Sequence, residues 1–194
     1  MKQARILTAA EFKRVLAVID AHRHSERNRA IFNLSFLGGL RACEIAALRV
    51  GDVVDDTDKV KTQVVLQAGM TKGNESNRVI VSSALQKALQ RYVDAVCASK
   101  TPNTPLIRSQ KGGAFRALTI VQLFAKFYAK AGIAGASSHS GRRQFITALA
   151  EGQINVRVIQ ALARHKHVNT TMRYIDVNDV KLQKAVEVAG VICG

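Results

Sequence analysis

The chain has 194 residues, and 47% of them are hydrophobic, which excludes a disordered chain and favours one globular domain. Lysine and arginine number 29 against 14 aspartates and glutamates, giving a formal net charge of +15. A charge of this size favours a polyanionic partner, first of all nucleic acid. The sequence contains no apolar run of about 18 residues, so it predicts no membrane-spanning helix and no membrane partner.

The three cysteines, Cys43, Cys97 and Cys193, are far apart and odd in number. They form neither the close pairs of a metal site nor an even disulfide framework. The sequence therefore predicts no metal and no cofactor, and a reducing cytoplasm is the simplest compartment. The first residues lack the apolar run of a secretory signal.

The N-terminal part of the chain predicts three helices. Thr8 and Glu11 have the spacing of a capping box, and the apolar residues that follow recur with a helical period up to Ile19. A second helix is predicted over residues 26–37, where Gly38-Gly39 ends it, and a third over residues 40–48.

The middle of the chain changes to β-branched runs. Residues 59–66 and 78–82 flank a polar, glycine-containing turn, which predicts an antiparallel hairpin. A short strand at residues 52–54 is predicted as a third member of this sheet.

Helical periodicity then returns to the end of the chain. Loops are predicted at residues 101–105 and at Gly112-Gly113. The sequence thus predicts a mainly α protein with a small antiparallel β-sheet, an α+β fold. The later predicted helices are 83–98, 119–131, about 141–151, 156–163, 170–174 and 179–188.

Four short motifs follow one another along this pattern, and a tyrosine follows the last of them. In this order they resemble the catalytic domain of the tyrosine recombinases, or phage-type integrases, over roughly residues 8–180. Four ordered motifs are far more specific than any one alone. The motifs are Gly39-Leu-Arg41-Ala-Cys-Glu44, Thr71-Lys72-Gly73-Asn74, His139-Ser-Gly-Arg142 and Leu162-Ala-Arg-His165, followed by Tyr174.

The resemblance implies the DNA breaking-rejoining fold and a single catalytic domain over residues 1–194. Its core would cover about residues 8–178, and residues 179–194 would form a C-terminal tail helix. The tail could dock on a neighbouring protomer or pack on its own domain. The family's separate N-terminal core-binding domain has no counterpart in the sequence, which fits either a single-domain recombinase or a catalytic fragment.

The resemblance assigns the catalytic roles to six residues. Phosphodiester cleavage needs the non-bridging oxygens neutralised and the leaving oxygen protonated. Arg41 and Arg142 would bind the phosphate as guanidinium forks. Tyr174 would be the nucleophile, and Lys72 the general acid toward the 5′ oxygen.

The other two catalytic residues are histidines. His139 would assist proton transfer or orient the phosphate, and His165 would donate a hydrogen bond to a phosphate oxygen. Glu44, three residues after Arg41, is predicted to support that arginine or a neighbouring histidine. Tyr92 and Tyr128 lie at helical spacing in apolar stretches and are predicted to serve packing only.

Further basic residues are predicted to contact the DNA backbone: Arg108, Lys111, Arg116 and Arg164. The chain also departs from the family's usual pattern at three positions. It has Gly141 where leucine is usual, Gln144 where threonine is common, and Arg164 where glycine is usual. None of these departures removes a predicted catalytic side chain.

The function implied is site-specific DNA recombination through a covalent 3′-phosphotyrosine and a Holliday junction, in a bacterial or phage-encoded protein at the nucleoid. Double-stranded DNA, a homotetramer on that DNA and accessory DNA-bending proteins are the implied partners. The alternatives are a type IB topoisomerase, with the same chemistry but no strand exchange, and a non-catalytic DNA-binding protein of the same fold. A metal-dependent nuclease is a third alternative, which the sequence disfavours because it contains no cluster of acidic metal ligands.

Overall fold

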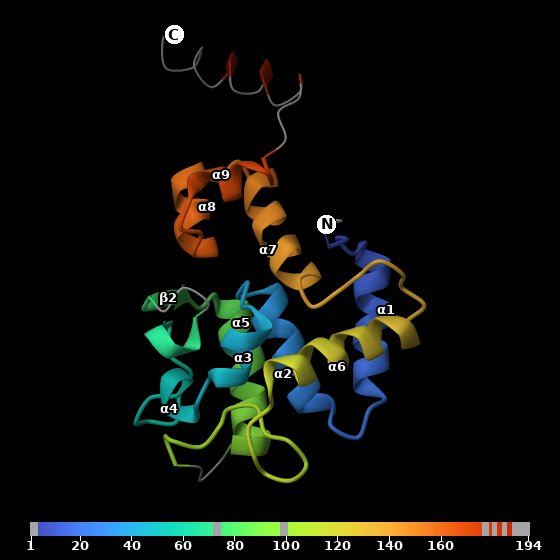
Figure 1. The fold of residues 1–194 in the computed structure, drawn as a ribbon, viewed down its shortest axis with the longest axis vertical. Helices are drawn as coiled ribbons and strands as arrows, with labels where there is room; N and C mark the ends of the chain where they lie inside the picture. Colours follow the sequence, from blue (N-terminus) through green and yellow to red (C-terminus); the bar gives the residue numbers. More distant parts are fainter. Residues whose placement is uncertain are drawn as a thin grey trace. The chain divides into compact units, whose positions relative to one another are not determined.

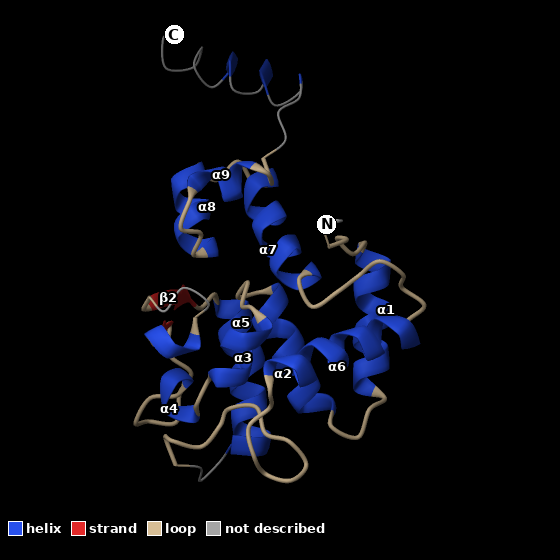
Figure 2. Cartoon of the chain, in the orientation of Figure 1, coloured by secondary structure: helices blue, strands red, loops and turns tan. Residues whose placement is uncertain are grey.

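The computed structural model describes residues 4–71, 75–97 and 101–175, together with residues 179, 182, 183, 186 and 187. The chain divides into two compact units, Met1–Ile146 and Thr147–Gly194. Figures 1 and 2 show that helices dominate the described residues and that strands form only one small sheet. The predicted fold class, mainly α with a small antiparallel sheet, is confirmed.

The helices of the first unit follow the predicted order. Helix α1 packs against α2 and α6, while α2 also packs against α5 (Figure 1). The unit also holds α7 up to Ile146. The helices are α1 (Ala9–Asp20), α2 (Ser25–Phe36), α3 (Ala42–Ala47), α4 (Val50–Val53), α5 (Ser83–Tyr92), α6 (Ala117–Lys130) and α7 (Ser140–Glu151).

Helix α1 begins with the predicted capping box. Thr8 Oγ1 accepts a hydrogen bond from Glu11 N at 3.2 Å, and Thr8 N donates to Glu11 Oε2 at 2.9 Å. The Thr8 amide, and after it the Arg5 guanidinium, lower the pKa of the Glu11 carboxyl. Both free amides at the helix start are thereby satisfied, which fixes where α1 begins.

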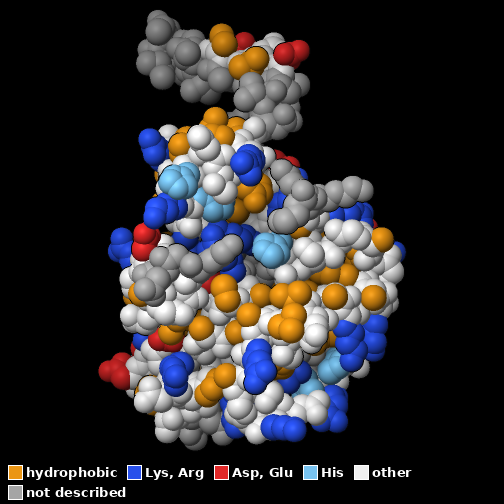
Figure 3. All heavy atoms as spheres, in the orientation of Figure 1, with side chains coloured by type: hydrophobic (Ala, Val, Ile, Leu, Met, Phe, Trp, Pro, Cys, Tyr) orange, Lys and Arg blue, Asp and Glu red, His pale blue; other side chains and the backbone are white. Residues whose placement is uncertain are grey.

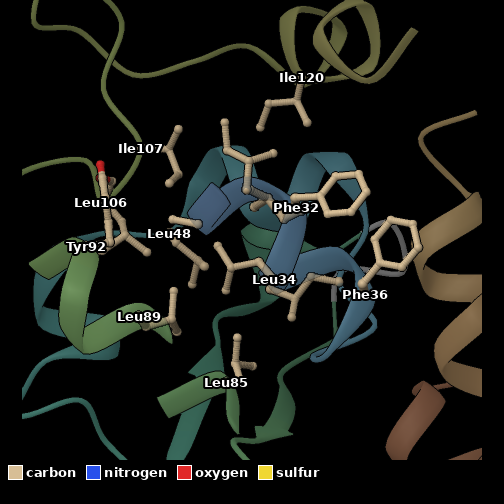
Figure 4. Packing of buried hydrophobic residues seen from close by; sticks show 14 of the residues in the cluster. Phe32, Leu34, Phe36, Leu48, Leu85, Leu89, Tyr92, Leu106, Ile107 and Ile120 are labelled. Carbon is tan, nitrogen blue, oxygen red and sulfur yellow. The ribbon is translucent and has the colours of Figure 1, made fainter. Parts of the chain in front are cut away.

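The core of the first unit is built around aromatic and branched side chains of α2, α5 and α6 (Figure 4). The rings of Phe32 and Phe36 stack with centroids 4.2 Å apart, and Phe12 of α1 contacts both rings. Leu85 and Leu89 of α5 are fully buried, and α5 packs against α2. This packed helix layer is the support on which α3 and the start of α7 lie.

The predicted hairpin is present as β1 (Gln63–Leu66) and β2 (Asn77–Ile80), paired antiparallel. Val64 pairs with Val79, and both side chains are buried, whereas Val65 and Ile80 on the opposite face are exposed. A short 3-10 helix, η1 (Ala68–Met70), follows β1. Buried and exposed residues alternate along the strands with the period of two that is typical of a half-buried sheet, whereas the prediction rested on the β-branched residues around a polar turn.

The predicted third strand at residues 52–54 is wrong. Residues Val50–Val53 form the one-turn helix α4, because the Asp52 carboxylate accepts the Arg49 amide at 2.7 Å and caps that turn. Of the predicted strand, only Val54 forms an isolated bridge, with Val60. A second difference is at the end of α5, where the predicted helix continues as the π-helical turn η2 (Val93–Cys97).

The second unit holds the rest of α7 together with α8 (Val156–Ala163) and α9 (Val168–Met172). Asn155 Oδ1 accepts the Arg157 amide at 2.8 Å and caps α8. Ile159 and Ala163 of α8 are fully buried, and α8 packs against α9.

The predicted tail helix at residues 179–188 lies largely outside the described residues, so its docking stays a prediction. Within the described part of the chain, no helix is long and apolar enough to cross a membrane.

Candidate active site

Arg41 is held by a buried carboxylate. Arg41 Nη1 donates to Glu44 Oε1 at 2.6 Å, and the Arg41 amide donates to Glu44 Oε2 at 2.8 Å. The Glu44 side chain is fully buried, whereas 27% of the Arg41 side chain is exposed. The carboxylate therefore caps the start of α3 and orients the arginine in one step, as the i, i+3 spacing predicted.

Arg142 is anchored to the backbone segment that precedes Arg41. Arg142 Nη1 donates to the carbonyl oxygen of Gly39 at 2.6 Å. Only 6% of Arg142 is exposed. Gly39 has a φ of +61°, and a Cβ at this position would lie 2.6 Å from the Phe145 ring. A glycine is thus needed at the turn that supplies this carbonyl. This turn connects the two predicted phosphate-binding arginines, since Arg41 follows it in the chain and Arg142 donates to its carbonyl oxygen.

Gly141 lets the start of α7 approach α2 closely. A Cβ at Gly141 would clash with Ser35 Oγ and would lie 2.6 Å from the ring of Phe36. Both neighbours are buried in α2. The departure from the usual leucine therefore has a structural reason, because no side chain fits here beside Phe36 without displacing α7.

Residues 143 and 144 attach α7 to the N-terminal segment. Gln144 Oε1 accepts the Leu7 amide at 3.0 Å, and Arg143 Nη1 donates to Ala4 O at 2.7 Å. Gln144, in place of the common threonine, is long enough to reach this amide. Sequence patterns did not reveal these contacts, since the partners are more than 130 positions apart.

His139 occupies the turn just before α7, and its side chain is exposed. Its amide donates to Ser137 Oγ at 3.3 Å, and its carbonyl accepts the Arg143 amide at 2.9 Å. The residue therefore begins the helix that carries Arg142.

Lys72 lies outside the described residues. The hairpin is described up to Thr71 and again from Glu75. Thr71 Oγ1 donates to Glu75 O at 2.9 Å, which ties the two sides of the predicted lysine-bearing turn together. The role of Lys72 stays a prediction.

His165 and Tyr174 lie together in the second unit. Their rings stack with centroids 6.0 Å apart and an interplanar angle of 26°. Thr171 Oγ1 lies 2.9 Å from His165 Nδ1, and Thr171 is fully buried. The side-chain nitrogen Nε2 of Gln160 donates to the backbone oxygen of His165 at 3.1 Å. The loop between α8 and α9 therefore fixes the histidine next to the tyrosine.

Tyr174 differs sharply from the other two tyrosines. Tyr92 and Tyr128 are each 1% exposed, and burial raises the pKa of both phenols. Tyr92 also donates to Leu106 O at 2.7 Å. Tyr174 is half-buried and follows the last turn of α9. The prediction that Tyr92 and Tyr128 serve packing is confirmed.

Arg164 ends α8 in the left-handed region, with φ 55° and ψ 47°. Glycine adopts this conformation at no steric cost, which explains physically why glycine suits this turn. Arg164 Nη1 donates to Leu162 O at 3.1 Å. The side chain thus contacts its own helix end.

The other predicted DNA-contacting residues differ in their surroundings. Lys111 and Arg116 are exposed, and Arg116 is the N-cap residue of α6. Arg108 is half-buried, and its Nε donates to Gly112 O at 3.3 Å. Lysine and arginine side chains are numerous on the face drawn in Figure 3, whereas aspartate and glutamate are sparse there.

Within the described ranges, no group of three or more His, Cys, Asp or Glu residues is arranged to hold a metal ion.

Comparisons with known proteins show which sequences and folds this chain is similar to. Over 190 residues the chain is 27% identical to the tyrosine recombinase XerA of Pyrococcus horikoshii, covering 96% of this chain and 61% of that protein. The crystal structure of a XerA recombinase superposes with a TM-score of 0.73 at 25% identity, over 97% of this chain and 64% of that one. The Tn1549 transposon integrase, solved in complex with circular intermediate DNA, shares the fold, with a TM-score of 0.75 at 18% identity over 97% of this chain and 68% of that one.

The chain thus spans less than two thirds of the length of the XerA relative. The match to the family model is more extensive, since it runs from residue 5 to residue 181 and includes all four sequence motifs and Tyr174. On this match, and on the fold that it shares with solved recombinases, the chain belongs to the phage integrase family.

Proposed function

We propose that this chain carries the catalytic residues of a site-specific DNA recombinase, which cleaves and rejoins DNA through a covalent 3′-phosphotyrosine. The observation that carries the proposal is the pair formed by His165 and Tyr174, with ring centroids 6.0 Å apart. Of the three tyrosines, Tyr174 alone is not buried in a core, so its hydroxyl can reach a polymeric substrate.

In the proposed reaction, the Tyr174 oxygen attacks the phosphorus of a DNA phosphodiester. The bond from phosphorus to the 5′ oxygen breaks, and the 3′ phosphate stays attached to the enzyme. Lys72 delivers a proton to the departing 5′ oxygen, since an alkoxide is too basic to leave unaided. In the reverse direction, a 5′ hydroxyl attacks the phosphotyrosine and releases the tyrosine, so rejoining needs no ATP and no metal.

Four further residues act at the scissile phosphate in this proposal. Arg41 and Arg142 neutralise its non-bridging oxygens with guanidinium groups that are always charged. His165 donates a hydrogen bond to a phosphate oxygen, and His139 assists proton transfer by accepting the proton that the Tyr174 hydroxyl loses on attack. Glu44 is a positioning residue, because it acts through Arg41.

Double-stranded DNA is the proposed substrate, and the net charge of +15 supports it. Exchange between two duplexes needs four strand cleavages, so we propose a homotetramer on DNA that passes through a Holliday junction. Accessory DNA-bending proteins and a cytoplasmic, nucleoid-associated location belong to the same proposal. The Tn1549 integrase, which shares the fold, was solved with circular intermediate DNA.

A trapping experiment tests the proposal. The protein is incubated with nicked DNA that carries the sequence flanking its own gene, and covalent adducts are separated on a denaturing gel. We expect an adduct with the parent protein and with Tyr128→Phe, with or without EDTA, and none with Tyr174→Phe. A band shift without an adduct would indicate a non-catalytic DNA-binding protein. Cleavage that EDTA abolishes would indicate a metal-dependent nuclease.

A further inference from the structure

A cationic cavity lies in the first unit, lined by none of the predicted catalytic residues. Its volume is about 420 Å³, and it lies between the start of α2, the π-helical turn η2 and the loop at residues 108–110. Three arginines, Arg23, Arg27 and Arg108, contribute to its lining, together with one carboxylate, Glu26. Side chains from segments more than 80 positions apart therefore meet around one hollow.

The three guanidinium groups are held by neutral partners. Arg27 donates through Nε and Nη2 to Asn28 Oδ1, at 3.2 and 3.1 Å, and through Nη1 to Arg108 O at 3.2 Å. Its guanidinium also lies 4.9 Å from the centroid of the Phe115 ring. Arg23 Nε donates to His24 Nε2 at 3.0 Å, and Arg108 Nε donates to Gly112 O at 3.3 Å. These contacts fix the positions of the charges without cancelling them.

No ion pair within 4.0 Å joins Arg23, Arg27 or Arg108 to an acid in the parts of the chain that the structure describes. The lining carboxylate Glu26 is instead 3.9 Å from Arg91, outside the cavity lining. Burial, and after it the nearby charge of Arg23, lowers the pKa of Arg27 despite an opposing effect of Tyr92. The cavity therefore gathers positive charge that an anion would stabilise.

The start of α2 adds to the positive electrostatic potential of the cavity. Its N-cap residue, His24, makes no side-chain capping hydrogen bond, so the first amides of this 12-residue helix lack a side-chain acceptor from the cap. Unsatisfied amides and the helix dipole favour negative charge at such an end. This contribution supports the three arginines, which remain the main source of charge.

Another part of the lining is apolar. Ala95 and Val96 of η2 contribute to it beside the buried Tyr92, and 38% of Val96 is exposed. A volume of a few hundred Å³ with an apolar wall and a few fixed polar groups is typical of sites for small organic ligands. Arginine clusters recognise phosphate groups through charge-assisted, bidentate hydrogen bonds.

We propose that this cavity binds a small organic phosphate of mononucleotide size, with the phosphate at Arg23, Arg27 and Arg108 and the apolar portion against Ala95 and Val96. The site is distinct from the residues assigned to DNA cleavage and does not depend on the proposed recombinase function. Arg108, predicted above to contact the DNA backbone, would here bind a small ligand.

The test measures binding of adenosine 5′-monophosphate, adenosine and inorganic phosphate to the full chain by isothermal titration calorimetry at low salt. We expect saturable binding of the nucleotide, and binding at least about tenfold weaker for adenosine, since each charge-assisted hydrogen bond is worth that much or more. Inorganic phosphate should bind more weakly than the nucleotide and compete with it.

Substitutions then locate the site. Arg23→Gln and Arg108→Gln should each weaken nucleotide binding about tenfold. Arg14→Gln, an exposed arginine of α1 outside the cavity, is the matched control and should change nothing. Val96→Trp should fill the apolar part and weaken the nucleotide more than inorganic phosphate. Circular dichroism checks that each variant is folded.

Four results would overturn the proposal. The first is no saturable nucleotide binding, and the second is equal affinity for adenosine and its monophosphate. The third is a loss in Arg14→Gln as large as that in the cavity variants. If Arg23→Gln and Arg108→Gln instead weaken binding of a DNA duplex and leave nucleotide binding unchanged, the arginines contact DNA and the small-ligand site is wrong.

Discussion

Arg142 Nη1 donates a 2.6 Å hydrogen bond to the carbonyl oxygen of Gly39, a residue 103 positions earlier in the chain. This bond connects the start of α7 to the turn that leads into Arg41 and α3. Arg142 is buried, so its position depends on the packing of the start of α7 within the first unit rather than on solvent. Substitutions that move either element should therefore disturb both predicted phosphate-binding arginines.

Gly141→Ala should destabilise the protein by about 1–3 kcal/mol, because the new Cβ would meet Ser35 Oγ and the Phe36 ring. Adduct formation should fall as well, since α7 must shift with Arg142. Urea unfolding measures the change in stability. Gly113→Ala is the matched control, since a Cβ there meets nothing within 4 Å, and it should change stability by less than about 0.5 kcal/mol. Equal effects of the two substitutions would show that close packing at Gly141 does not matter.

Glu44→Gln should reduce stability by about 1–3 kcal/mol and slow adduct formation, because the buried carboxylate accepts two hydrogen bonds from Arg41. Glu26→Gln is the control, since Glu26 is partly exposed and lies 3.9 Å from Arg91. Exposed pairs of this kind contribute little, so its effect should stay within about 0.5 kcal/mol. Unchanged adduct formation in Glu44→Gln would contradict the positioning role.

Gln153→Gly should stabilise the second unit by about 1 kcal/mol, because Gln153 has a φ of 58° that glycine adopts without strain. Hydrogen exchange of the α8 amides reports on this unit. Ala150→Gly, inside α7, should have the opposite sign and cost about 1 kcal/mol. A loss of protection in Gln153→Gly would mean that the side chain contributes more than its backbone strain costs.

His22 should make stability depend on pH near neutrality. Burial is the largest cause that lowers the pKa of His22, and Lys126, Arg27, Lys130 and Arg23 lower it further. The unfolded chain therefore binds more protons at His22 than the folded chain does, and stability falls as the pH drops from about 7 toward 5. Urea unfolding at both pH values should show a smaller loss for His22→Gln than for the parent. An equal loss in both proteins would show that His22 does not contribute.

Local patterns predicted the elements that local interactions determine. The capping box at Thr8, the antiparallel hairpin and the bounds of α8 all follow from residues a few positions apart. The i, i+3 spacing likewise predicted that Glu44 supports Arg41. The strand expected at residues 52–54 failed for a local reason, since the Asp52 cap outweighs the preference of its valine neighbours for strands.

Contacts between distant segments were not predictable from these patterns. The Gly39 carbonyl that accepts Arg142, and the Leu7 amide that binds Gln144, become neighbours only after α7 packs in the first unit. Gly141 and Arg164 looked like departures from a family pattern, and their reasons are a close approach and a left-handed backbone. The sequence predicted separate roles for Tyr174 and His165 and no pairing of the two side chains, whereas the structure shows their rings stacked with centroids 6.0 Å apart.

The most direct test of the central claim is to identify the residue that carries the DNA. The trapped adduct is digested with nuclease and protease, and its peptides are analysed by mass spectrometry. The proposed mechanism predicts a nucleotide attached to the peptide that contains Tyr174, and no such mass in Tyr174→Phe. A nucleotide on Tyr92, Tyr128 or any other residue, or cleaved DNA with no peptide attached, would contradict it.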